Sequence, residues 1–371
     1  MIESVEPVDG TSAASEERKL LQEAAAALRF DRPRAAHRLY ARALELASSD
    51  DTRAEALEGL GFVAHKTGRP REAARLFEEA LQLLSQDAGD RPELADALGR
   101  AYAAIGELER SSALFERALR VAKQRGDTEG QVGFAALLSY ALTDRGRFDE
   151  AERMLEDVRA GAEGSDDPAV RARVEWAHAR LRGEQGHTER ALEHARAALE
   201  LFTEAGAERS VALAYDMLAS LTNDLGRPED ALEILRNGWP LLLENASPLQ
   251  VAHARIEEAR ALAALGENEG AAAVAMRVAA QLDGTHPGDA GRAYVLLGEI
   301  FDKLGDVARA RQLYETGIAL LTKQGPNRYL VNAYRRLADL FEAEYRTEDA
   351  VGVLRRALAV QAQVDRAITD F

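Results

Sequence analysis

Glycine and other small residues recur along this chain at a nearly constant interval, and an internal repeat restricts the possible folds more than any other sequence feature. Residues 60–81 and 98–119 share one spacing of leucine, glycine, alanine and phenylalanine, and residues 297–318 and 337–358 follow it with similar residues. Weaker copies fill the gaps. The turn positions of the copies are 31, 68, 106, 146, 186, 226, 266, 305 and 345, which lie 37 to 40 residues apart. Nine copies therefore account for almost the whole chain.

Each recurring feature has a physical reason in a pair of packed helices. A glycine such as Gly68 lies just past the end of the first helix, where a left-handed backbone conformation ends a helix at little cost. Small residues such as Gly61 lie where two helix backbones approach closely, and large residues such as Phe77 fill the neighbouring hole. Apolar residues recur every three or four positions, and only stacking of neighbouring pairs can bury the resulting stripe. The pattern predicts an all-α solenoid of about nine helix pairs.

This arrangement of Gly61, Phe77 and their equivalents resembles the tetratricopeptide repeat (TPR) family over residues 17–366. The usual TPR period is about 34 residues, so the copies here are longer. The resemblance implies a right-handed superhelical solenoid over residues 16–371, after a flexible acidic tail over residues 1–15. The expected repeats are approximately 17–50, 54–88, 92–126, 132–166, 172–206, 212–246, 252–286, 291–325 and 331–366.

The whole chain is also similar to the TPR sensor part of helix-turn-helix transcriptional regulators from high-GC Gram-positive bacteria. Residues 137–142 and 174–181 carry much of this likeness. The roughly 15 residues before the first repeat are too few for a DNA-binding helix-turn-helix. The resemblance therefore implies a sensor or regulatory adaptor without its DNA reader.

Composition excludes several classes of protein. The net charge of −16 repels a nucleic-acid backbone, and no run of lysine and arginine offsets it, so we expect no direct nucleic-acid binding. The chain has no cysteine, which excludes disulfides, thiolate zinc sites and a cysteine nucleophile. The first 15 residues do not resemble a secretory signal, and no apolar run is long enough to span a membrane. We expect a cytoplasmic bacterial protein.

No signature of catalysis is present: the chain lacks a phosphate-binding loop, a zinc pair of histidines and a nucleophile elbow. Glu175 and His178 form one Glu-x-x-His step, but di-iron sites need that step on two helices. We interpret this pair as packed on one helix face, and His187 and His194 as solvated. The sequence thus predicts a non-enzymatic protein with no cofactor and no metal.

The best candidates for function lie on a stripe of the first helix of each copy, at positions that line the concave groove in TPR proteins. The middle of this stripe mixes aromatic, arginine and amide side chains, which are enriched at binding hot spots. The predicted groove residues are Tyr140, Arg173, Trp176, Arg180, Asp216, Ser220, Asn223, His253 and Arg260. The same stripe also carries Thr143, Ile256, Arg292, Glu299, Asp302, Asn332, Arg335 and Asp339.

The two tryptophans of the chain have different interpretations. Trp176 is either an apolar floor of the groove or a packing residue, because the helix register leaves both open. Trp239 occupies a motif position that usually holds leucine, so we interpret it as a core residue. Pro240 beside it is expected to start a new turn and to bend the solenoid.

The leading hypothesis is a binding module that captures a peptide or an extended segment of a protein in its groove. Arginine can form a fork onto a carboxylate, and asparagine can hold an extended backbone through its donor and acceptor together. The alternative is a structural scaffold or homodimer that binds through its C-terminal end or convex face. Its basis is the apolar face of the last helix, about Val351 to Ile368, which no polar capping helix follows. The partner itself is not readable, because TPR folds serve unrelated partners.

Overall fold

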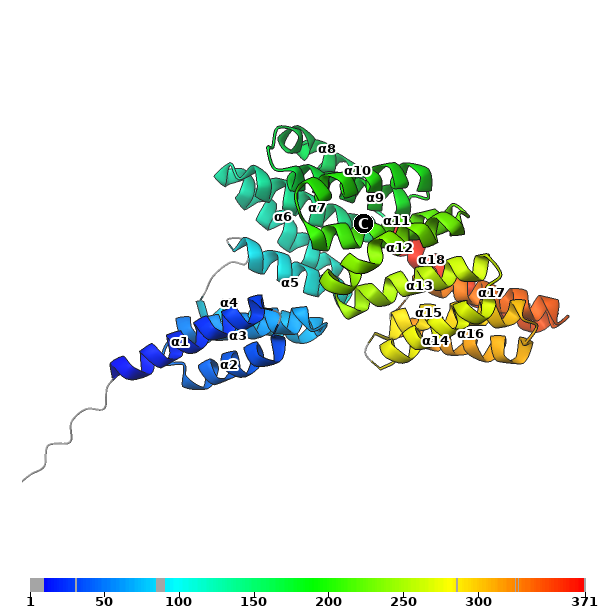
Figure 1. Cartoon of the computed structure of the whole chain (residues 1–371), viewed down its shortest axis with the longest axis horizontal. Helices are drawn as coiled ribbons and strands as arrows, with labels where there is room; N and C mark the ends of the chain where they lie inside the picture. The colour runs from blue at the N-terminus through cyan, green and yellow to red at the C-terminus, as the bar shows by residue number, and fades with distance from the viewer. Residues whose placement is uncertain are drawn as a thin grey trace, which may run out of the picture. The chain divides into compact units, whose positions relative to one another are not determined.

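A computed structural model describes residues 10–30, 32–84, 91–284, 286–323, 325 and 327–369 of the 371-residue chain. These residues form 18 α-helices and no strand (Figure 1). The helices are α1 (Gly10–Arg29), α2 (Pro33–Leu46), α3 (Asp50–Lys66), α4 (Pro70–Leu84), α5 (Pro92–Ala104), α6 (Leu108–Arg125), α7 (Thr128–Asp144), α8 (Phe148–Glu163), α9 (Pro168–Glu184), α10 (Thr188–Glu204), α11 (Glu208–Asp224), α12 (Pro228–Asn245), α13 (Pro248–Ala264), α14 (Asn268–Leu282), α15 (Pro287–Lys303), α16 (Val307–Thr322), α17 (Arg328–Ala343) and α18 (Thr347–Thr369). The predicted class, an all-α solenoid of nine helix pairs, is confirmed.

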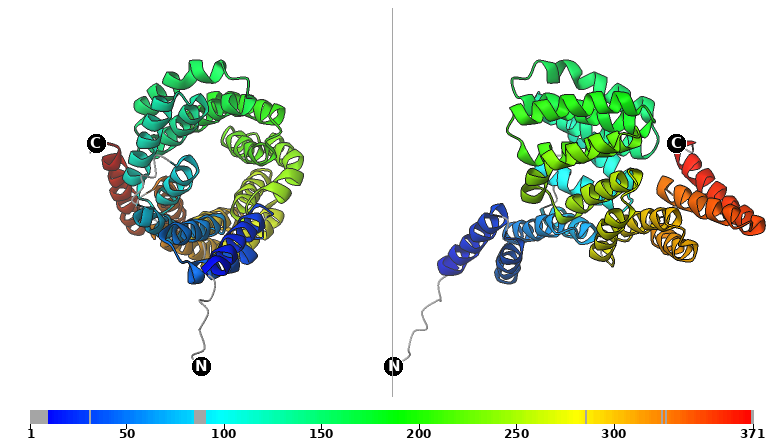
Figure 2. Two further views of the ribbon diagram at one scale, coloured as in Figure 1. Left: turned by 90° about the vertical axis from the view of Figure 1, so that its left-hand side faces the viewer. Right: turned by 45° about the vertical axis from the view of Figure 1, so that its right-hand side comes forward.

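The chain divides into two compact units. The first comprises Met1–Asp144 and Arg153–Ala162, and the second comprises Arg145–Glu152 and Glu163–Phe371. Consecutive helices pack side by side from α1 to α7 in the first unit and from α9 to α18 in the second (Figure 2). The first helices of neighbouring copies are also in contact. Helix α11 contacts α13, and α13 contacts α15. The sequence predicts a single solenoid over residues 16–371, and its repeat spacing carries no signal for this division.

The turns within the helix pairs are made by left-handed glycines, as the repeat predicts. The φ angle lies between 70° and 85° at Gly68, Gly106, Gly146, Gly186, Gly226, Gly266 and Gly305. The ninth copy has Tyr345 at this position, with a φ of 58°. Asp31, the predicted turn of the first copy, lies outside the described residues. The glycines are needed because a residue with a Cβ atom is strained in this conformation.

In three pairs, α3 with α4, α5 with α6 and α15 with α16, a glycine on the first helix receives an aromatic ring from the second. A Cβ atom at Gly61 would lie 2.6 Å from Cε1 of Phe77, and one at Gly298 would lie 2.6 Å from Cδ1 of Tyr314. Both rings are fully buried, with exposed fractions of 0% for Phe77 and 1% for Tyr314. The ring therefore occupies the space that any larger residue would need, and this contact sets the distance between the two helices.

The buried side chains of the second unit form clusters that each span at least three consecutive helices. One cluster joins α9, α10 and α11, another joins α11, α12 and α13, and two larger ones continue from α13 to α18. Alanine is common in all of them, so the helices approach closely. No pair closes a core by itself, which agrees with the prediction that stacking buries the apolar stripes. Among the described residues, no helix is long and apolar enough to cross a membrane.

The third copy begins at residue 92 as predicted, and the other copies whose first helix has a described start begin a little before the predicted ones. Helix α9 begins at Pro168 and α13 at Pro248, where the expected repeats begin at 172 and 252. Asp167 and Ser247 cap these two helices, and their side-chain oxygens accept hydrogen bonds from backbone N–H groups of the first turn. At the N-terminal end, α1 begins at Gly10, inside the expected flexible tail of residues 1–15. Residues 1–9 of that tail lie outside the described residues.

Helix α12 continues through Pro240 to Asn245, so the predicted start of a new turn at Pro240 is wrong. The side chains on either side hold the helix together: Leu235 and Leu242 are fully buried in one cluster, and Trp239 packs against it. The guanidinium carbon of Arg255 lies 3.8 Å from the centre of the Trp239 ring and covers its outer face. Trp239 is therefore half-buried and packs against the core, where the sequence predicted a residue of the core itself.

We expect Gly298→Ala to lower the free energy of unfolding by about 1–3 kcal/mol, because the new methyl group must displace the buried ring of Tyr314. The matched control is Gly352→Ala in α18, where an added Cβ meets nothing within 4 Å. This control should raise the stability by roughly 0.5–1 kcal/mol, since alanine is the better helix former. Urea denaturation of both variants measures the difference, and equal effects would contradict the proposed packing role.

Candidate functional site

The first helices of the last four copies line a pocket in the second unit, with a volume of about 300 Å³. We call it the second-unit pocket. Its lining residues are Ser220, Asp224, Ile256, Arg260, Arg292, Val295, Leu296, Glu299, Leu321, Tyr329, Asn332 and Arg336. All except Leu321 come from α11, α13, α15 and α17, so the exposed stripe of the first helices builds the site.

The pocket combines an apolar floor with a polar rim. Ile256, Leu296 and Leu321 are buried side chains that reach it from three different helices. Asn332 lies on its rim and is exposed, and among the described residues its amide makes no hydrogen bond. Ligand pockets commonly have this composition, in which apolar surface gives affinity and a few polar groups fix orientation.

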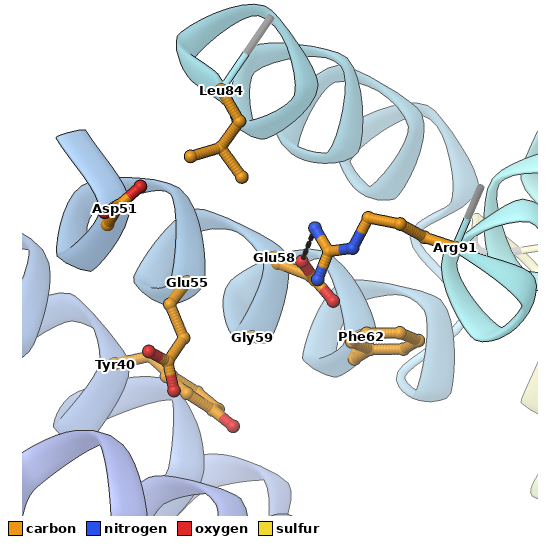
Figure 3. A pocket seen from close by; sticks show the side chains of 8 residues that line it. All are labelled: Tyr40, Asp51, Glu55, Glu58, Gly59, Phe62, Leu84 and Arg91. Carbon is orange, nitrogen blue, oxygen red and sulfur yellow. Dashed lines mark ion pairs between the residues drawn. The ribbon is translucent and has the colours of Figure 1, made fainter. Parts of the chain in front are cut away.

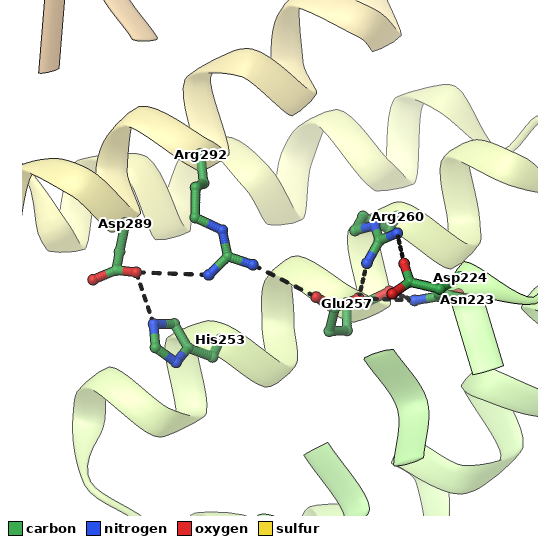
Figure 4. Close-up of polar contacts among 7 residues, drawn as sticks. All are labelled: Asn223, Asp224, His253, Glu257, Arg260, Asp289 and Arg292. Atoms are coloured by element: carbon green, nitrogen blue, oxygen red, sulfur yellow. Dashed lines mark hydrogen bonds and ion pairs between the residues drawn. The ribbon is translucent and has the colours of Figure 1, made fainter. Parts of the chain in front are cut away.

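Beside the pocket, the carboxylate of Glu257 accepts hydrogen bonds from two side chains, one on its own helix α13 and one on α11 (Figure 4). Its side chain is only 4% exposed. Arg260 donates to it at 2.6 Å, and the amide of Asn223 donates to it at 3.1 Å and to its backbone carbonyl at 2.9 Å. Arg260 also donates to Asp224 at 2.7 Å. The network joins α11 to α13 and satisfies the buried charge of Glu257.

A second part of the network joins α13 to α15. Nε2 of His253 lies 2.9 Å from Oδ1 of Asp289. Arg292 lies between the two carboxylates, 3.8 Å from Glu257 and 3.7 Å from Asp289, so both ion pairs are longer than a hydrogen bond (Figure 4). Its guanidinium carbon stands 4.4 Å from the centre of the Tyr329 ring, a cation–π contact that fixes its position.

Asp216 of α11 is the one unsatisfied acid next to this network among the described residues. Its Oδ1 atom is shielded from solvent and has no hydrogen-bond partner. Burial raises the pKa of its carboxyl to about 7; the charges of His253 and Arg292 oppose this rise and that of Glu257 adds to it. Asp216 therefore holds a proton over much of the range below neutral pH.

The charges of the network move two other pKa values. For Arg260, burial acts to lower the pKa, and the adjacent carboxylates of Glu257 and Asp224 outweigh it, so the net shift is upward. For Asp289, burial acts to raise the pKa, and the hydrogen bond and charge of His253 together with Arg292 outweigh it, so the net shift is downward. Both groups stay charged at neutral pH.

The structure brings together the part of the predicted groove stripe that lies in the last four copies. Ser220 and Arg260 line the second-unit pocket, and Asp216, Asn223 and His253 lie in or next to the network beside it. From the continuation of the stripe, the pocket also contains Ile256, Arg292, Glu299 and Asn332. The donor group of Asn223 is engaged by α13, so the exposed Asn332 is better placed to hold a ligand backbone.

The predicted residues of the fourth and fifth copies are not among the lining residues of this pocket. Trp176 is half-buried and packs edge-to-face on Phe202, with ring centres 6.2 Å apart. It also packs against a second cluster of α9, α10 and α11, which is formed by Ala172, Ala198, Phe202 and Val211, and this favours the packing interpretation. Tyr140, Arg173 and Arg180 are half-buried, and their role in a groove stays a prediction.

The interpretation of His194 as solvated is wrong. Its Nδ1 lies 2.7 Å from Glu175, and its ring stacks on the buried ring of His178 at 5.1 Å. The reason is that α9 and α10 face each other here, so the Glu175–His178 step packs against the second helix of its own pair. Among the described residues, no group of three or more histidine, aspartate or glutamate side chains is placed to hold a metal ion.

The first unit has a pocket of its own, with a volume of about 520 Å³ (Figure 3). It is lined by Tyr40, Asp51, Glu55, Glu58, Gly59, Phe62, Leu84 and Arg91. Arg91 pairs with Glu58 at 2.5 Å. Burial raises the pKa of Glu58, Arg91 opposes the rise, and Glu55 and Glu93 add to it. Three carboxylates against one guanidinium make this pocket acidic.

Sequence reasoning missed several residues of the second-unit pocket, including Asp224, Leu296, Tyr329 and Arg336. Each lies three or four positions from a predicted stripe residue on the same helix, as Arg336 does from Asn332. That spacing places them on the same helix face, and it could have identified them. Leu321, from a second helix, had no such signal.

Comparison with known proteins agrees with this architecture. The model of the MalT-like TPR region matches residues 53–286, and a tetratricopeptide repeat model matches residues 291–320. The chain belongs to the MalT-like TPR family. A comparison with the curated protein sequences finds no match.

Several solved structures share the TPR fold of this family member. A Rap protein complexed with Competence and Sporulation Factor has a TM-score of 0.61 at 15% identity, over 98% of this chain and 89% of that chain. NprR in complex with its cognate peptide NprX has a TM-score of 0.56 at 14% identity, over 73% and 79%. A STAND protein with a TPR sensor from Pyrococcus horikoshii has a TM-score of 0.59 at 15% identity, over 99% and 55%. At these identities the likeness shows the fold alone.

Asp216→Asn should stabilise the MalT-like TPR chain, and more strongly as the pH rises. The raised pKa means that the folded chain keeps a proton that the unfolded chain loses above about 3.8, so the wild-type stability falls up to about pH 7. We expect a gain in the free energy of unfolding on the order of 2 kcal/mol at pH 8, and little gain near pH 4.5. Urea denaturation at both pH values measures it.

The control for this prediction is Asp302→Asn, which changes an exposed carboxylate of α15. The change that it causes in the free energy of unfolding should be small and nearly the same at both pH values. A gain from Asp216→Asn that is the same at both pH values would show that Asp216 does not titrate as described.

Proposed function

We propose that this chain is a non-enzymatic binding module that captures a peptide or an extended protein segment in the second-unit pocket. The observation that carries this proposal is the pocket itself, in which first helices of four consecutive copies place an apolar floor below a polar rim. A side chain of the ligand enters the floor, and its backbone lies along the rim. The ligand therefore contacts the predicted concave stripe mainly in the later copies of the repeat.

The rim offers the groups that an extended backbone needs. A peptide in extended form presents one N–H and one C=O group per residue, and burial of these groups is costly unless they are hydrogen-bonded. Asn332 can donate and accept at once, and Ser220 can do the same with its hydroxyl on the opposite side, from α11. Ile256 and Leu296 between them take an aliphatic or aromatic side chain.

Two of the structures that share the fold were solved with a bound partner, and in one of them that partner is a peptide. The Rap protein was solved with Competence and Sporulation Factor, and NprR was solved with its cognate peptide NprX. Their fold can therefore hold a small partner, and the pocket of this chain has the composition for one. We further propose that the chain works in the cytoplasm of a bacterium as a regulatory adaptor or sensor, as its likeness to TPR sensors suggests.

The proposal is tested with an immobilised chain and a pool of random synthetic hexapeptides, with retained peptides quantified by mass spectrometry. We expect Asn332→Ala to lower retention about tenfold, which corresponds to the loss of one or two hydrogen bonds. Ser220→Trp, which fills the pocket, should abolish retention.

The control is Arg335→Ala, an exposed residue of α17 that does not line the pocket. It should retain peptides like the wild type, and all variants should keep the wild-type melting temperature within a few degrees. Equal retention by wild type, Asn332→Ala and Ser220→Trp would place binding elsewhere. No retention by the wild type would contradict peptide capture altogether.

A second candidate function is self-association through the outer face of α18. Val351 and Leu358 lie seven residues apart, on one helix face, and are 42% and 65% exposed. Exposed apolar stripes of this kind commonly mark contacts with another chain. The side chains from residue 364 onward, including Ile368 of the predicted apolar face, lie outside the described side chains.

This candidate predicts that the wild-type chain dimerises at micromolar concentration and that Leu358→Glu keeps it monomeric. Arg356→Glu, an exposed change on the same helix, is the control and should leave dimerisation intact. Sedimentation velocity over a range of concentrations measures the state. A wild-type monomer at every concentration rules out this function.

A further inference from the structure

The three arginines of the second-unit pocket differ in the number of hydrogen bonds that their guanidinium groups donate to carboxylates. Arg260 donates to two carboxylates at 2.6 and 2.7 Å, and Arg336 pairs with Glu299 at 3.0 Å. Arg292 has carboxylates nearby but, among the described residues, makes no hydrogen bond to either of them. Its guanidinium therefore keeps donors that can form a fork onto an incoming anion.

The carboxylates next to Arg292 lie beyond hydrogen-bond distance, at 3.8 Å for Oε1 of Glu257 and 3.7 Å for Oδ1 of Asp289. Oε2 of Glu257 accepts from Arg260 and Asn223, and Oδ1 of Asp289 is hydrogen-bonded to His253. Arg292 is meanwhile held in position by the Tyr329 ring and by two long ion pairs, none of which uses up its hydrogen-bond donors. A guanidinium that is fixed in place but not saturated is prepared to bind a ligand, since little entropy is lost when a carboxylate docks on it.

Asp216 lies within reach of the same group of charges, and its Oδ1 atom is shielded from solvent without a hydrogen-bond partner in the described part of the chain. The residues whose charges act on it are His253 and Glu257 of α13 and Arg292 of α15. The other helices packed against α11 are α10 and α12, and no charge of their described residues contributes to its shift. Because Arg292 favours the ionised form of Asp216, an anion that neutralises Arg292 makes the proton on Asp216 more stable.

We propose that the second-unit pocket takes an anionic group of its ligand onto Arg292, and that Asp216 takes up a proton from solvent as this group binds. This inference rests on the proposed function and names the chemistry of the ligand. The ligand carries a carboxylate, either at a peptide C-terminus or on an aspartate or glutamate side chain, next to an apolar residue that fills the floor. Its binding tightens as the pH falls from 8 to 6, because the proton and the anion stabilise each other.

The coupling can be measured without any ligand. In the full chain with ¹³C-labelled aspartate carboxyl groups, the Asp216 signal is identified by its loss in Asp216→Asn. Arg292→Gln should raise the pKa of Asp216 by about one unit, because it removes a favourable charge. Arg336→Gln is the matched control, since Arg336 lines the pocket but does not act on Asp216. No shift in Arg292→Gln, or an equal shift in both variants, overturns the coupling.

The ligand chemistry is tested with two random hexapeptide pools on the immobilised chain, one with free C-terminal carboxylates and one with C-terminal amides. Carboxylate-bearing peptides should be retained about fivefold more strongly at pH 6 than at pH 8, as expected for a one-unit shift around a pKa of about 7. This ratio should fall to about one in Asp216→Asn, and Arg292→Gln should lose retention at both pH values. A pH dependence that survives Asp216→Asn assigns the proton to His253 and overturns the proposal.

The two pools separate the sources of the carboxylate. Retention of the free-acid pool alone identifies the peptide C-terminus, and retention of amidated peptides enriched in aspartate and glutamate identifies a side chain. Retention of lysine- and arginine-rich peptides with the opposite pH dependence overturns the proposal and leaves peptide capture intact. If the wild type retains no peptide from either pool at pH 6 or pH 8, the proposed function itself fails.

Discussion

The contact between a helix glycine and an aromatic ring of the paired helix is the constraint on which the rest of this structure depends. Tyr314 lies where the side chain of any residue larger than Gly298 would have to be, so the two helices can only pack at this distance. Stacking of such pairs then buries their apolar stripes. As a result, first helices of neighbouring copies touch, and residues about 35 positions apart in the sequence come within hydrogen-bond distance, as Asn223 does with Glu257. The second-unit pocket is a consequence of this stacking.

Electrostatics then gives the pocket its character. Buried charges are tolerated only when they are paired, and Glu257 shows the usual solution, with hydrogen bonds from Arg260 and Asn223. Two groups next to it depart from this rule. Among the described residues, Arg292 has two ion pairs but no hydrogen bond to either acid, and the half-buried Asp216 has a shielded Oδ1 atom without a hydrogen-bond partner. Unsatisfied polar groups of this kind reduce stability, and they cluster where a chain keeps interactions for a ligand.

The fold could be predicted well from the sequence because nine copies of one pattern occur, and the same limits on residue size and backbone conformation apply to each copy. Left-handed turns at Gly226 and Gly266 and the packing of Phe77 follow from residue size and backbone freedom alone. Two predictions failed where tertiary packing outweighs a local rule. Helix α12 continues through Pro240 because Leu235 and Leu242 on either side of it are buried, and His194 is drawn to Glu175 by the opposing helix.

The site was predicted only in part, for a related reason. The stripe of first-helix residues identified Ser220, Arg260, Arg292 and Asn332 as pocket residues, because one helix face is readable from spacing. Whether a stripe residue binds a ligand or a neighbouring helix depends on contacts between copies, which spacing does not encode; Trp176 therefore packs on Phe202. The most direct test is a crystal structure of the chain with the hexapeptide that it retains most strongly. Peptide density over Asn332 and Arg292 is the predicted result, and density confined to any other surface would contradict the assignment of the pocket.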